Sequence, residues 1–236
     1  RWVAVKAMGM ITPAELECLS TSLAVAARAV LWSLPCAVAA DGVLSRPRFP
    51  GKLGLDGLAH LPLILPPVLV GFLLLVLLGR QGLLGGWLDG VGIHLPFTRN
   101  GAALATAVMA FPLFVRSVRL AFEATESRLF EAAALLRAGP LDRFVSIALP
   151  LAGPGILAGT VTAFAAALGE FGAVITFAAN IPGQTQTLPL AIYAVLQQPG
   201  GEAEAIRLAG LSILLALTGL AFAELLQRWS RKRHAG

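Results

Sequence analysis

Long apolar runs separated by short polar segments dominate the pattern of this chain. Four runs, residues 61–79, 101–115, 147–179 and 206–227, approach or exceed the roughly 20 mostly apolar residues that cross a bilayer as a helix. A fifth run, 16–40, contains Arg28. A mid-helix arginine costs only about 2.5–3.5 kcal/mol on insertion scales, which apolar neighbours can offset. The pattern predicts an all-α, polytopic membrane protein with about five transmembrane helices.

Two of these runs have features that predict bends. Residues 61–79 include Pro66 and Pro67, and proline lacks the amide proton that a helix interior uses. Residues 147–179 are too long for an untilted span. We expect this helix to begin at the membrane surface and to bend around Pro150 and Pro154. Residues 188–196 are apolar but too short to span, so they should form a short helix within a loop over 180–201.

Composition agrees with this class. Apolar residues make up 57% of the 236 residues and charged residues only 13%, against about 25% charged in a soluble domain. We therefore expect a single transmembrane domain over residues 1–236. A net charge of +5 would indicate nucleic acid binding in a soluble protein. Here the placement of the charges along the chain explains it better, so no nucleic acid partner is expected.

The basic residues predict the orientation, because loops rich in Lys and Arg stay on the cytoplasmic side. With five spans, the loops and termini divide into two sets that lie on opposite sides of the membrane. One set carries Arg46, Arg48, Lys52, Arg116, Arg119, Arg128, Arg137, Arg143, Arg228, Arg231, Lys232 and Arg233. The other set carries only Arg1, Lys6, Arg80, Arg99 and Arg207. We therefore expect a cytoplasmic C-terminus and an N-terminus outside.

One polar stretch on the predicted cytoplasmic side stands apart from the apolar runs. Residues 127–143 read SRLFEAAALLRAGPLDR, in which an apolar stripe is followed by the helix-breaking pair Gly139 and Pro140. The pattern predicts two short helices joined by a turn. From the residues alone, such a helix either inserts into a groove of another protein or lies on the lipid surface.

The spacing within this stretch resembles the coupling motif of ABC importer permeases. In that motif Glu-Ala-Ala is followed, after three residues, by Gly, and after nine more by Ile-x-Leu-Pro. The residues that match here are Glu131, Ala132, Ala133, Ile147, Leu149 and Pro150. The resemblance implies that residues 127–150 bind a cytoplasmic ATPase. One position departs: Arg137 stands where the family has glycine, so we expect the turn to depend on Gly139 and Pro140.

The likeness extends from about residue 58 to residue 233 and is to the molybdate permease subunits of bacterial ABC importers. Pieces such as HLPLILPPVLVGFLLL and ALGEFGAVITFAANIPGQTQTLPLAIY carry it. It implies a type I ABC importer permease fold in the bacterial inner membrane, working as a homodimer. Two ABC ATPase subunits would bind ATP, so this chain itself would hold no cofactor. A periplasmic or extracellular molybdate-binding protein would deliver molybdate, or tungstate, to the outer face.

A carboxylate inside the long fourth run is the main candidate within the translocation pathway. The candidate pathway residues there are Gly169, Glu170, Phe171 and Gly172. Glu170 would repel an oxyanion, so it either pairs with an arginine, caps a helix, lies near the gate or hydrogen-bonds between helices. We expect Gly169 and Gly172 to let two copies of the span approach closely. Hydroxyls suit an oxyanion better, and Thr160, Thr162 and Thr176 are the candidates, unless they only bond back to their own helix.

Three alternatives to a molybdate permease remain at this point. A sulfate or thiosulfate permease belongs to the same superfamily. A membrane-embedded enzyme lacks support, because no paired catalytic carboxylates, metal-ligand cluster or activated nucleophile stands out within the spans. An ATP-independent channel would leave the stretch at 127–150 without a purpose. The sequence also lacks a Gly-Lys-Ser/Thr phosphate-binding loop, so we expect this chain not to bind ATP itself. Its three histidines are scattered without metal-ligand spacing, and we expect neither catalytic nor metal-binding residues.

Overall fold

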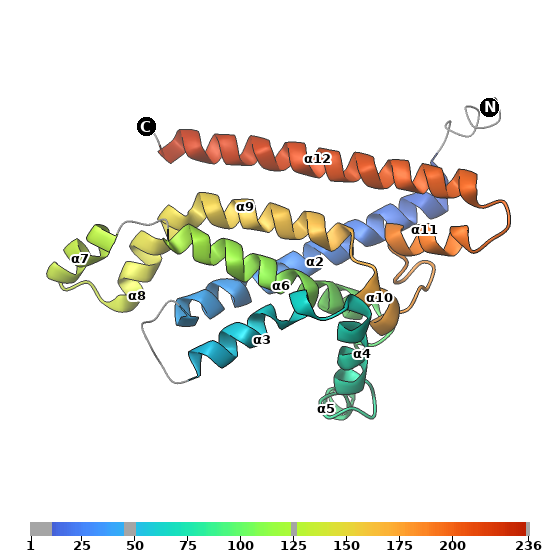
Figure 1. Ribbon diagram of the computed structural model, residues 1–236, viewed down its shortest axis with the longest axis horizontal. Helices are drawn as coiled ribbons and strands as arrows, with labels where there is room; N and C mark the ends of the chain where they lie inside the picture. The colour runs from blue at the N-terminus through green and yellow to red at the C-terminus, as the bar shows by residue number, and fades with distance from the viewer. Residues whose placement is uncertain (1–10, 45–50, 124–126, 235–236) are drawn as a thin grey trace.

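A computed structural model describes residues 11–44, 51–123 and 127–234, and this part of the chain consists of helices joined by turns and loops, without strands. Figure 1 shows the helices and their labels. Their bounds are α2 Pro13–Leu44, α3 Lys52–Ile64, α4 Pro67–Leu78, α5 Gly85–Gly90, α6 Arg99–Glu123, α7 Ser127–Leu135, α8 Pro140–Arg143, the π-helical turn η1 Phe144–Ala148, α9 Leu149–Leu168, α10 Gly172–Phe177, α11 Leu188–Leu196 and α12 Glu202–His234.

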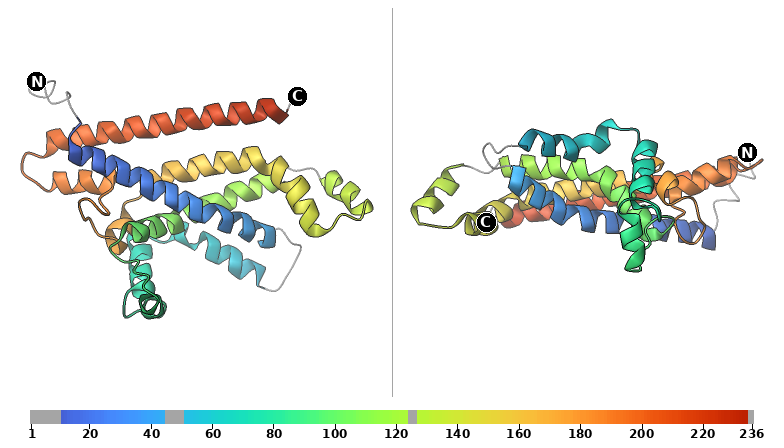
Figure 2. Two further views of the ribbon diagram at one scale, coloured as in Figure 1. Left: turned by 180° about the vertical axis from the view of Figure 1, so that it is seen from behind. Right: turned by 90° about the horizontal axis from the view of Figure 1, so that it is seen from below.

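α2, α3, α6, α9 and α12 run along the long axis of the molecule, whereas α4 points away from it (Figures 1 and 2). Four helices are long and apolar enough to cross a membrane, and the bent pair α3 and α4 makes a fifth crossing if it counts as one span. The start of α2 lies at the end that holds α11, whereas the end of α12 lies at the opposite end, with α7 and α8. The prediction of an all-α fold with about five spans is confirmed.

The first predicted span forms one continuous helix. α2 runs unbroken through Arg28 and Pro35, and its polar start is closed by a capping box. In that box Thr12 Oγ1 accepts from the Glu15 amide at 3.2 Å, while Glu15 Oε2 accepts from the Thr12 amide at 2.8 Å. Glu15 is buried and also accepts from Arg207 Nε at 3.0 Å, which ties the start of α2 to α12.

The run 61–79 departs furthest from expectation, because its prolines do more than kink a helix. α3 ends at Ile64, Leu65 is extended, and α4 begins at Pro67 after a bend of 118°. Proline has no amide proton and disfavours a helical conformation in the residue before it. Two successive prolines therefore end one helix and begin another, so that α4 projects from the side of the bundle (Figure 1).

The long run 147–179 changes direction just before Pro150, as predicted, while Pro154 lies inside α9, and the helix ends earlier than predicted. Figures 1 and 2 show the chain changing direction between α8 and α9, where η1 precedes Pro150. The Pro150 ring would clash with the carbonyl four residues earlier, and a wider turn relieves this clash. Accordingly, the Leu149 amide donates to the carbonyl of Phe144, five residues back. α9 then stops at Leu168, and α10 starts only at Gly172.

Small residues allow the central helices to pack closely. Buried side chains from α2, α6 and α9, among them Ala37, Phe114 and Ala163, form one core cluster. On α9, Gly155 and Gly159 face α6, and a Cβ at either position would lie 2.5 Å from the Cβ of Ala121 or Ser117 respectively. This small-xxx-small spacing is the usual means of close helix approach in membranes.

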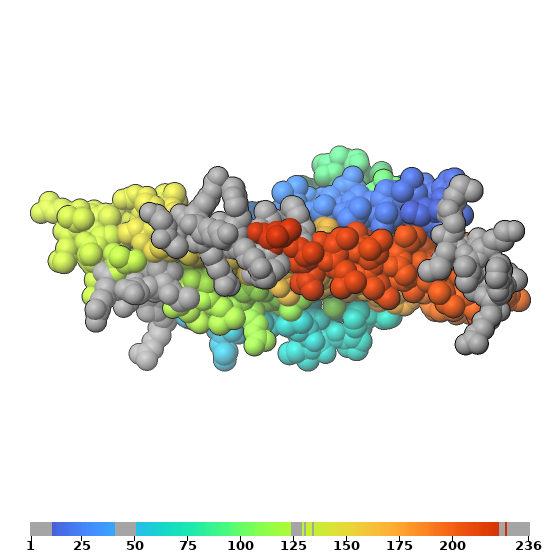
Figure 3. Space-filling view, turned by 90° about the horizontal axis from the view of Figure 1, so that it is seen from above, coloured from blue at the N-terminus to red at the C-terminus, as the bar shows by residue number. Residues whose placement is uncertain are grey.

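The bundle leaves much apolar surface uncovered. α12 lies on the outside of the bundle, with α2 along one of its sides (Figure 3). Its apolar side chains are largely exposed, as are those of α3 and α4. Examples are Ile213, Leu214, Leu217, Leu58, Phe72 and Val76. This pattern is expected of a chain whose outer surface contacts lipid or another membrane-embedded subunit.

Candidate functional site

The turn after α7 takes an unexpected conformation at Arg137. This residue has φ of 61°, in the left-handed region that glycine normally occupies. The Ala138 amide donates to the Ala133 carbonyl at 3.0 Å, which is the six-to-one bond of a Schellman motif. The helix is therefore capped at the position where the family motif has glycine, although this chain has arginine there.

The expectation that Gly139 and Pro140 form the turn is only half right. Gly139 has φ of −65° and ψ of 161°, which any residue adopts, so it supplies no left-handed turn. Pro140 does begin α8. At this first helical position an amide would have no partner within the helix, so proline loses no hydrogen bond there. The sharp reversal is thus made by Arg137, and Gly139 is extended backbone leading into the next helix.

The apolar stripe predicted on residues 127–143 is not buried against the rest of the chain. Ala133 is buried, but Leu129, Ala132 and Leu136 are exposed, and Leu136 keeps 84% of its surface. Leu135 and Leu141 beside the turn are also exposed. Glu131 is exposed as well. These side chains are therefore available to a partner.

The second half of the motif forms the joint between this hairpin and the membrane helices. Ile147 and Leu149 are half-buried around the fully packed Ala148, and Pro150 follows on the exposed side. The ring of Phe144 lies 5.5 Å from that of Phe122 at the end of α6, centroid to centroid. The π-helical turn thus connects α7 and α8 to both α6 and α9, so a movement of the hairpin would reach both helices.

Glu170 lies in the break between α9 and α10 and caps the second helix. Its Oε1 accepts from the Ala173 amide at 2.9 Å, so among the roles considered for it the structure supports helix capping. No arginine pairs with it among the described residues. Phe171 beside it packs on Tyr193 of α11, with ring centroids 5.2 Å apart.

The two helix breaks lie against each other. A Cβ on Gly172 would stand 2.7 Å from the Cβ of Pro67, and one on Gly71 would stand 2.6 Å from the Ala173 carbonyl oxygen. The close approach seen at Gly172 is to α4 of the same chain, and the predicted approach between two copies stays a prediction. Gly169 has no such neighbour and is exposed, so its predicted role at a copy-to-copy contact stays a prediction.

The three threonine candidates make local hydrogen bonds. Thr160 donates to the Ile156 carbonyl at 2.9 Å, Thr162 to that of Ala158 at 3.1 Å, and Thr176 to that of Gly172 at 2.9 Å. Back-bonding of this kind satisfies each hydroxyl donor within its own helix. The geometry thus supports the expectation that these hydroxyls bond back to their own helix, not that they face an oxyanion.

The loop 179–187 is more ordered than its sequence indicates. Thr185 is fully buried, donates to the Ala179 carbonyl at 3.0 Å and accepts from the Ile181 amide at 3.0 Å. Arg99, at the start of α6, donates to the carbonyls of Gly183 and Gln184. Sequence reasoning missed this clamp, because the arginine and the loop are more than 80 residues apart. The loop's threonines stand in the sequence, but no local pattern there indicates that Thr185 and Arg99 hold the loop.

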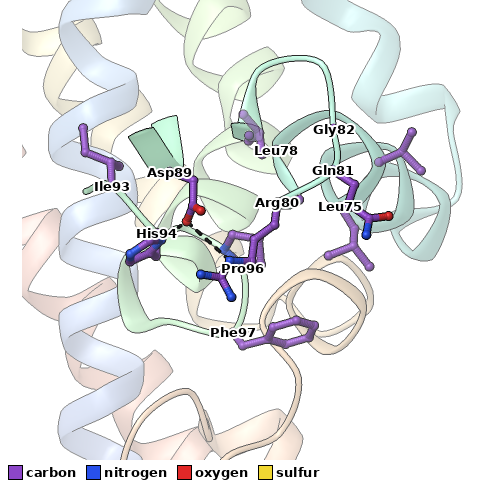
Figure 4. A pocket seen from close by; sticks show the side chains of 13 residues that line it. Leu75, Leu78, Arg80, Gln81, Gly82, Asp89, Ile93, His94, Pro96 and Phe97 are labelled. Carbon is purple, nitrogen blue, oxygen red and sulfur yellow. Dashed lines mark ion pairs between the residues drawn. The ribbon is translucent and has the colours of Figure 1, made fainter. Parts of the chain in front are cut away.

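A pocket of about 670 Å³ opens beside α4 and the loop that follows it. Figure 4 shows its lining, with the apolar side chains of Leu75, Leu78 and Phe97 near a polar group. In that group Asp89 Oδ1 lies 2.5 Å from His94 Nδ1 and 3.5 Å from Arg80 Nε. The Asp89 carboxylate thus contacts both Arg80 and His94 and links the two ends of the segment between α4 and α6.

A known protein family matches this chain over residues 33–233. Its description is "binding-protein-dependent transport system inner membrane component". The chain belongs to this family. Members are non-catalytic, multi-pass inner-membrane subunits of ABC transport systems, which agrees with the apolar helices described above.

Two curated relatives of this permease cover nearly the whole chain. The "molybdenum transport system permease protein ModB" of Escherichia coli strain K12 is 51% identical over 95% of this chain and 98% of its own length. The protein of the same name from Haemophilus influenzae is 47% identical over 93% of this chain and 94% of its own length.

Solved structures agree on the fold alone. A bacterial ABC transporter involved in the import of the acidic polysaccharide alginate matches with a TM-score of 0.76, at 16% identity, over 92% of this chain and 80% of that chain. An amino acid ABC transporter matches with a TM-score of 0.66, at 18% identity, over 92% of this chain and 94% of that chain. The prediction of an ABC importer permease fold is thereby confirmed.

Proposed function

We propose that this chain is the membrane permease subunit of an ATP-driven importer that moves molybdate, and on chemical similarity tungstate, into the cytoplasm. The observation that carries the proposal is the 51% identity, over 95% of the chain, to a permease named for molybdenum transport. The Haemophilus influenzae relative carries the same name. This favours molybdate over the sulfate or thiosulfate alternative, which shares the general fold.

The energy for transport would come from two separate ATPase subunits bound to α7 and α8. Supporting this, the hairpin exposes Leu129, Leu136 and Leu141 instead of burying them. The joint at Phe144–Ala148 contacts the end of α6 and leads directly into α9, so a displaced hairpin would turn both spans. ATP would bind only to those subunits, and this chain would hold no cofactor.

The permease would work as a homodimer with the pathway between the copies. The exposed apolar side chains of α3, α4 and α12 support this, because two copies would cover part of that surface. The C-terminus and the hairpin would face the cytoplasm, the N-terminus would lie outside, and a binding protein would deliver the substrate to the face that holds α11. The excess of Arg and Lys on the hairpin side supports this orientation.

Within the dimer, we expect the oxyanion to pass the two helix breaks at Leu65–Pro66 and Gly169–Phe171. Discontinuous helices leave backbone groups without helical partners, and such groups bind ions in many transporters. The three threonine hydroxyls donate within their own helices, so they are poorer candidates for this role. The transporter would alternate between an inward-open and an outward-open conformation, because the two conformations would differ in their affinities for ATP and substrate.

Reconstituted uptake tests the proposal. Proteoliposomes would contain this chain with the ATPase subunit of the same transport system, and the binding protein would be added outside. With the binding protein outside, the ATPase face of a working transporter lies inside the vesicle, so molybdate uptake should require ATP inside. Sulfate at equal concentration should fail to inhibit this uptake. Uptake without the ATPase subunit would support a channel instead. Equal uptake of sulfate would support the sulfate alternative.

A further inference from the structure

Arg137 combines two properties, a left-handed backbone and an exposed side chain, that a purely structural residue would not need. Its φ of 61° is in a region that asparagine, aspartate and above all glycine adopt more readily than arginine. Its side chain is exposed. Strained backbone of this kind persists where the surroundings enforce it and is concentrated at functional sites. A glycine at this position would make the same cap without strain, so the cap alone does not account for an arginine.

The guanidinium of Arg137 has no partner among the described residues. No ion pair or hydrogen bond joins it to another side chain there. The nearest acidic residue along α8, Asp142, accepts instead from Ser146 Oγ at 2.9 Å. Arginine carries five donors in a planar fork, and these donors suit a carboxylate. The turn therefore presents an unused, carboxylate-binding group to the surface.

The surroundings of Arg137 resemble the centre of a protein interface. Leu135, Leu136 and Leu141 lie beside it in the turn, and each keeps more than 70% of its surface exposed. Apolar contacts around a charged residue exclude water from it when a partner binds, which strengthens the ion pair that it forms. An exposed arginine without such neighbours would gain little from a partner.

We propose that Arg137 forms an ion pair with a carboxylate on the cytoplasmic ATPase subunit, as an anchor in addition to the apolar contacts of α7. The inference rests on the proposed function, in which that subunit binds the hairpin. It assigns the left-handed arginine a role in partner recognition. The same turn then caps α7 and directs the guanidinium away from the permease.

The test measures the affinity between the permease in lipid nanodiscs and the purified ATPase subunit at several salt concentrations. Arg137→Asn suits the left-handed conformation and removes the charge, Arg137→Gly removes the strain and the charge, and Arg137→Lys keeps the charge without the fork. We expect the Asn and Gly variants to bind about three- to tenfold more weakly, with a smaller salt dependence. Arg137→Lys should lie in between.

Two controls separate the possible explanations. Arg80→Asn removes an exposed arginine just after α4, outside the hairpin of α7 and α8, and should leave the affinity unchanged. The melting temperature of Arg137→Gly alone should equal or exceed that of the unaltered chain, because the strain is gone. Weaker binding by a variant of equal or greater stability then reflects a lost contact, not a lost fold.

The possible outcomes distinguish a failure of the Arg137 ion pair from a failure of the proposed function on which it rests. If the unaltered permease does not bind the ATPase subunit at all, the proposed function is wrong, and the inference fails with it. If the unaltered permease binds but Arg137→Asn and Arg137→Gly bind equally well with the same salt dependence, the ion pair is absent. The proposed function then stands, with α7 held by apolar contacts alone.

Discussion

Replacing Gly159 by alanine tests how closely α9 packs on α6. An added Cβ would lie 2.5 Å from the Cβ of Ser117, 3.1 Å from its Oγ and 3.8 Å from its Cα. Non-bonded carbon atoms prefer separations of about 3.5–4.0 Å. The Ser117 hydroxyl can rotate away, but its Cβ is fixed to the α6 backbone. The helices must therefore move apart by about 1 Å, which disturbs the buried contacts between them.

The magnitude follows from two opposing effects. Alanine is favoured over glycine in a helix by about 1 kcal/mol, whereas overpacking a close contact costs about 1–3 kcal/mol. Gly153 provides a matched control, because it lies in the same helix and a Cβ there meets nothing within 4 Å. Both variants gain the same helix propensity, so this gain cancels in their difference. We expect Gly159→Ala to be less stable than Gly153→Ala by about 1–3 kcal/mol.

Thermal unfolding of the purified permease in detergent measures this difference. A difference of 1 kcal/mol corresponds to about 2–4 °C for a chain of this size. Ser117→Gly in the Gly159→Ala background removes the opposing Cβ and should recover most of the loss, which a double-mutant cycle would quantify. Equal melting temperatures for the Gly159→Ala and Gly153→Ala variants would refute the close packing of α9 on α6.

Two further predictions concern the break between α9 and α10 and the loop 179–187. Glu170→Ala should lower stability by about 1 kcal/mol, because the cap on the Ala173 amide is lost, while Glu170→Gln keeps an acceptor and should retain most uptake activity. Loss of uptake by the Gln variant at unchanged stability would instead indicate that the charge itself serves transport. Thr185→Val removes a buried hydroxyl and leaves the Ala179 carbonyl and the Ile181 amide without their partner, so we expect a loss of about 1–3 kcal/mol and faster hydrogen exchange at the Ile181 amide. Thr162→Val, on an exposed helix face, is the control, and equal exchange in both variants would contradict the assignment.

The spans could be predicted from the sequence because their evidence is local. Apolar runs of sufficient length exist independently of what packs on them, so α2, α6 and α12 and the short α11 were predicted. The bend before Pro150 also followed from a local cause. The size of the bend at Pro66 did not, because two prolines permit anything from a kink to a full break. Contacts with α10 and α6 accompany the break that forms here.

The candidate sites also divide into features with a local sequence signal and features that depend on distant contacts. The spacing of Glu131 to Pro150 was sufficient to find the hairpin and to flag Arg137 as unusual. Its left-handed conformation could not be read from the residue type, since arginine rarely adopts it. Likewise, Gly172 was recognised as a contact residue, but its neighbour is Pro67, about 100 residues away along the chain. Pairings over such separations depend on the whole fold.

ATP-dependent uptake of molybdate by the reconstituted transporter tests the central claim most directly. Vesicles containing this permease and its ATPase subunit, supplied with the binding protein, should accumulate molybdate only with ATP, and vanadate should stop the uptake. A tenfold excess of sulfate should leave the uptake unchanged. Accumulation that continues without ATP, or that sulfate abolishes, would contradict the account.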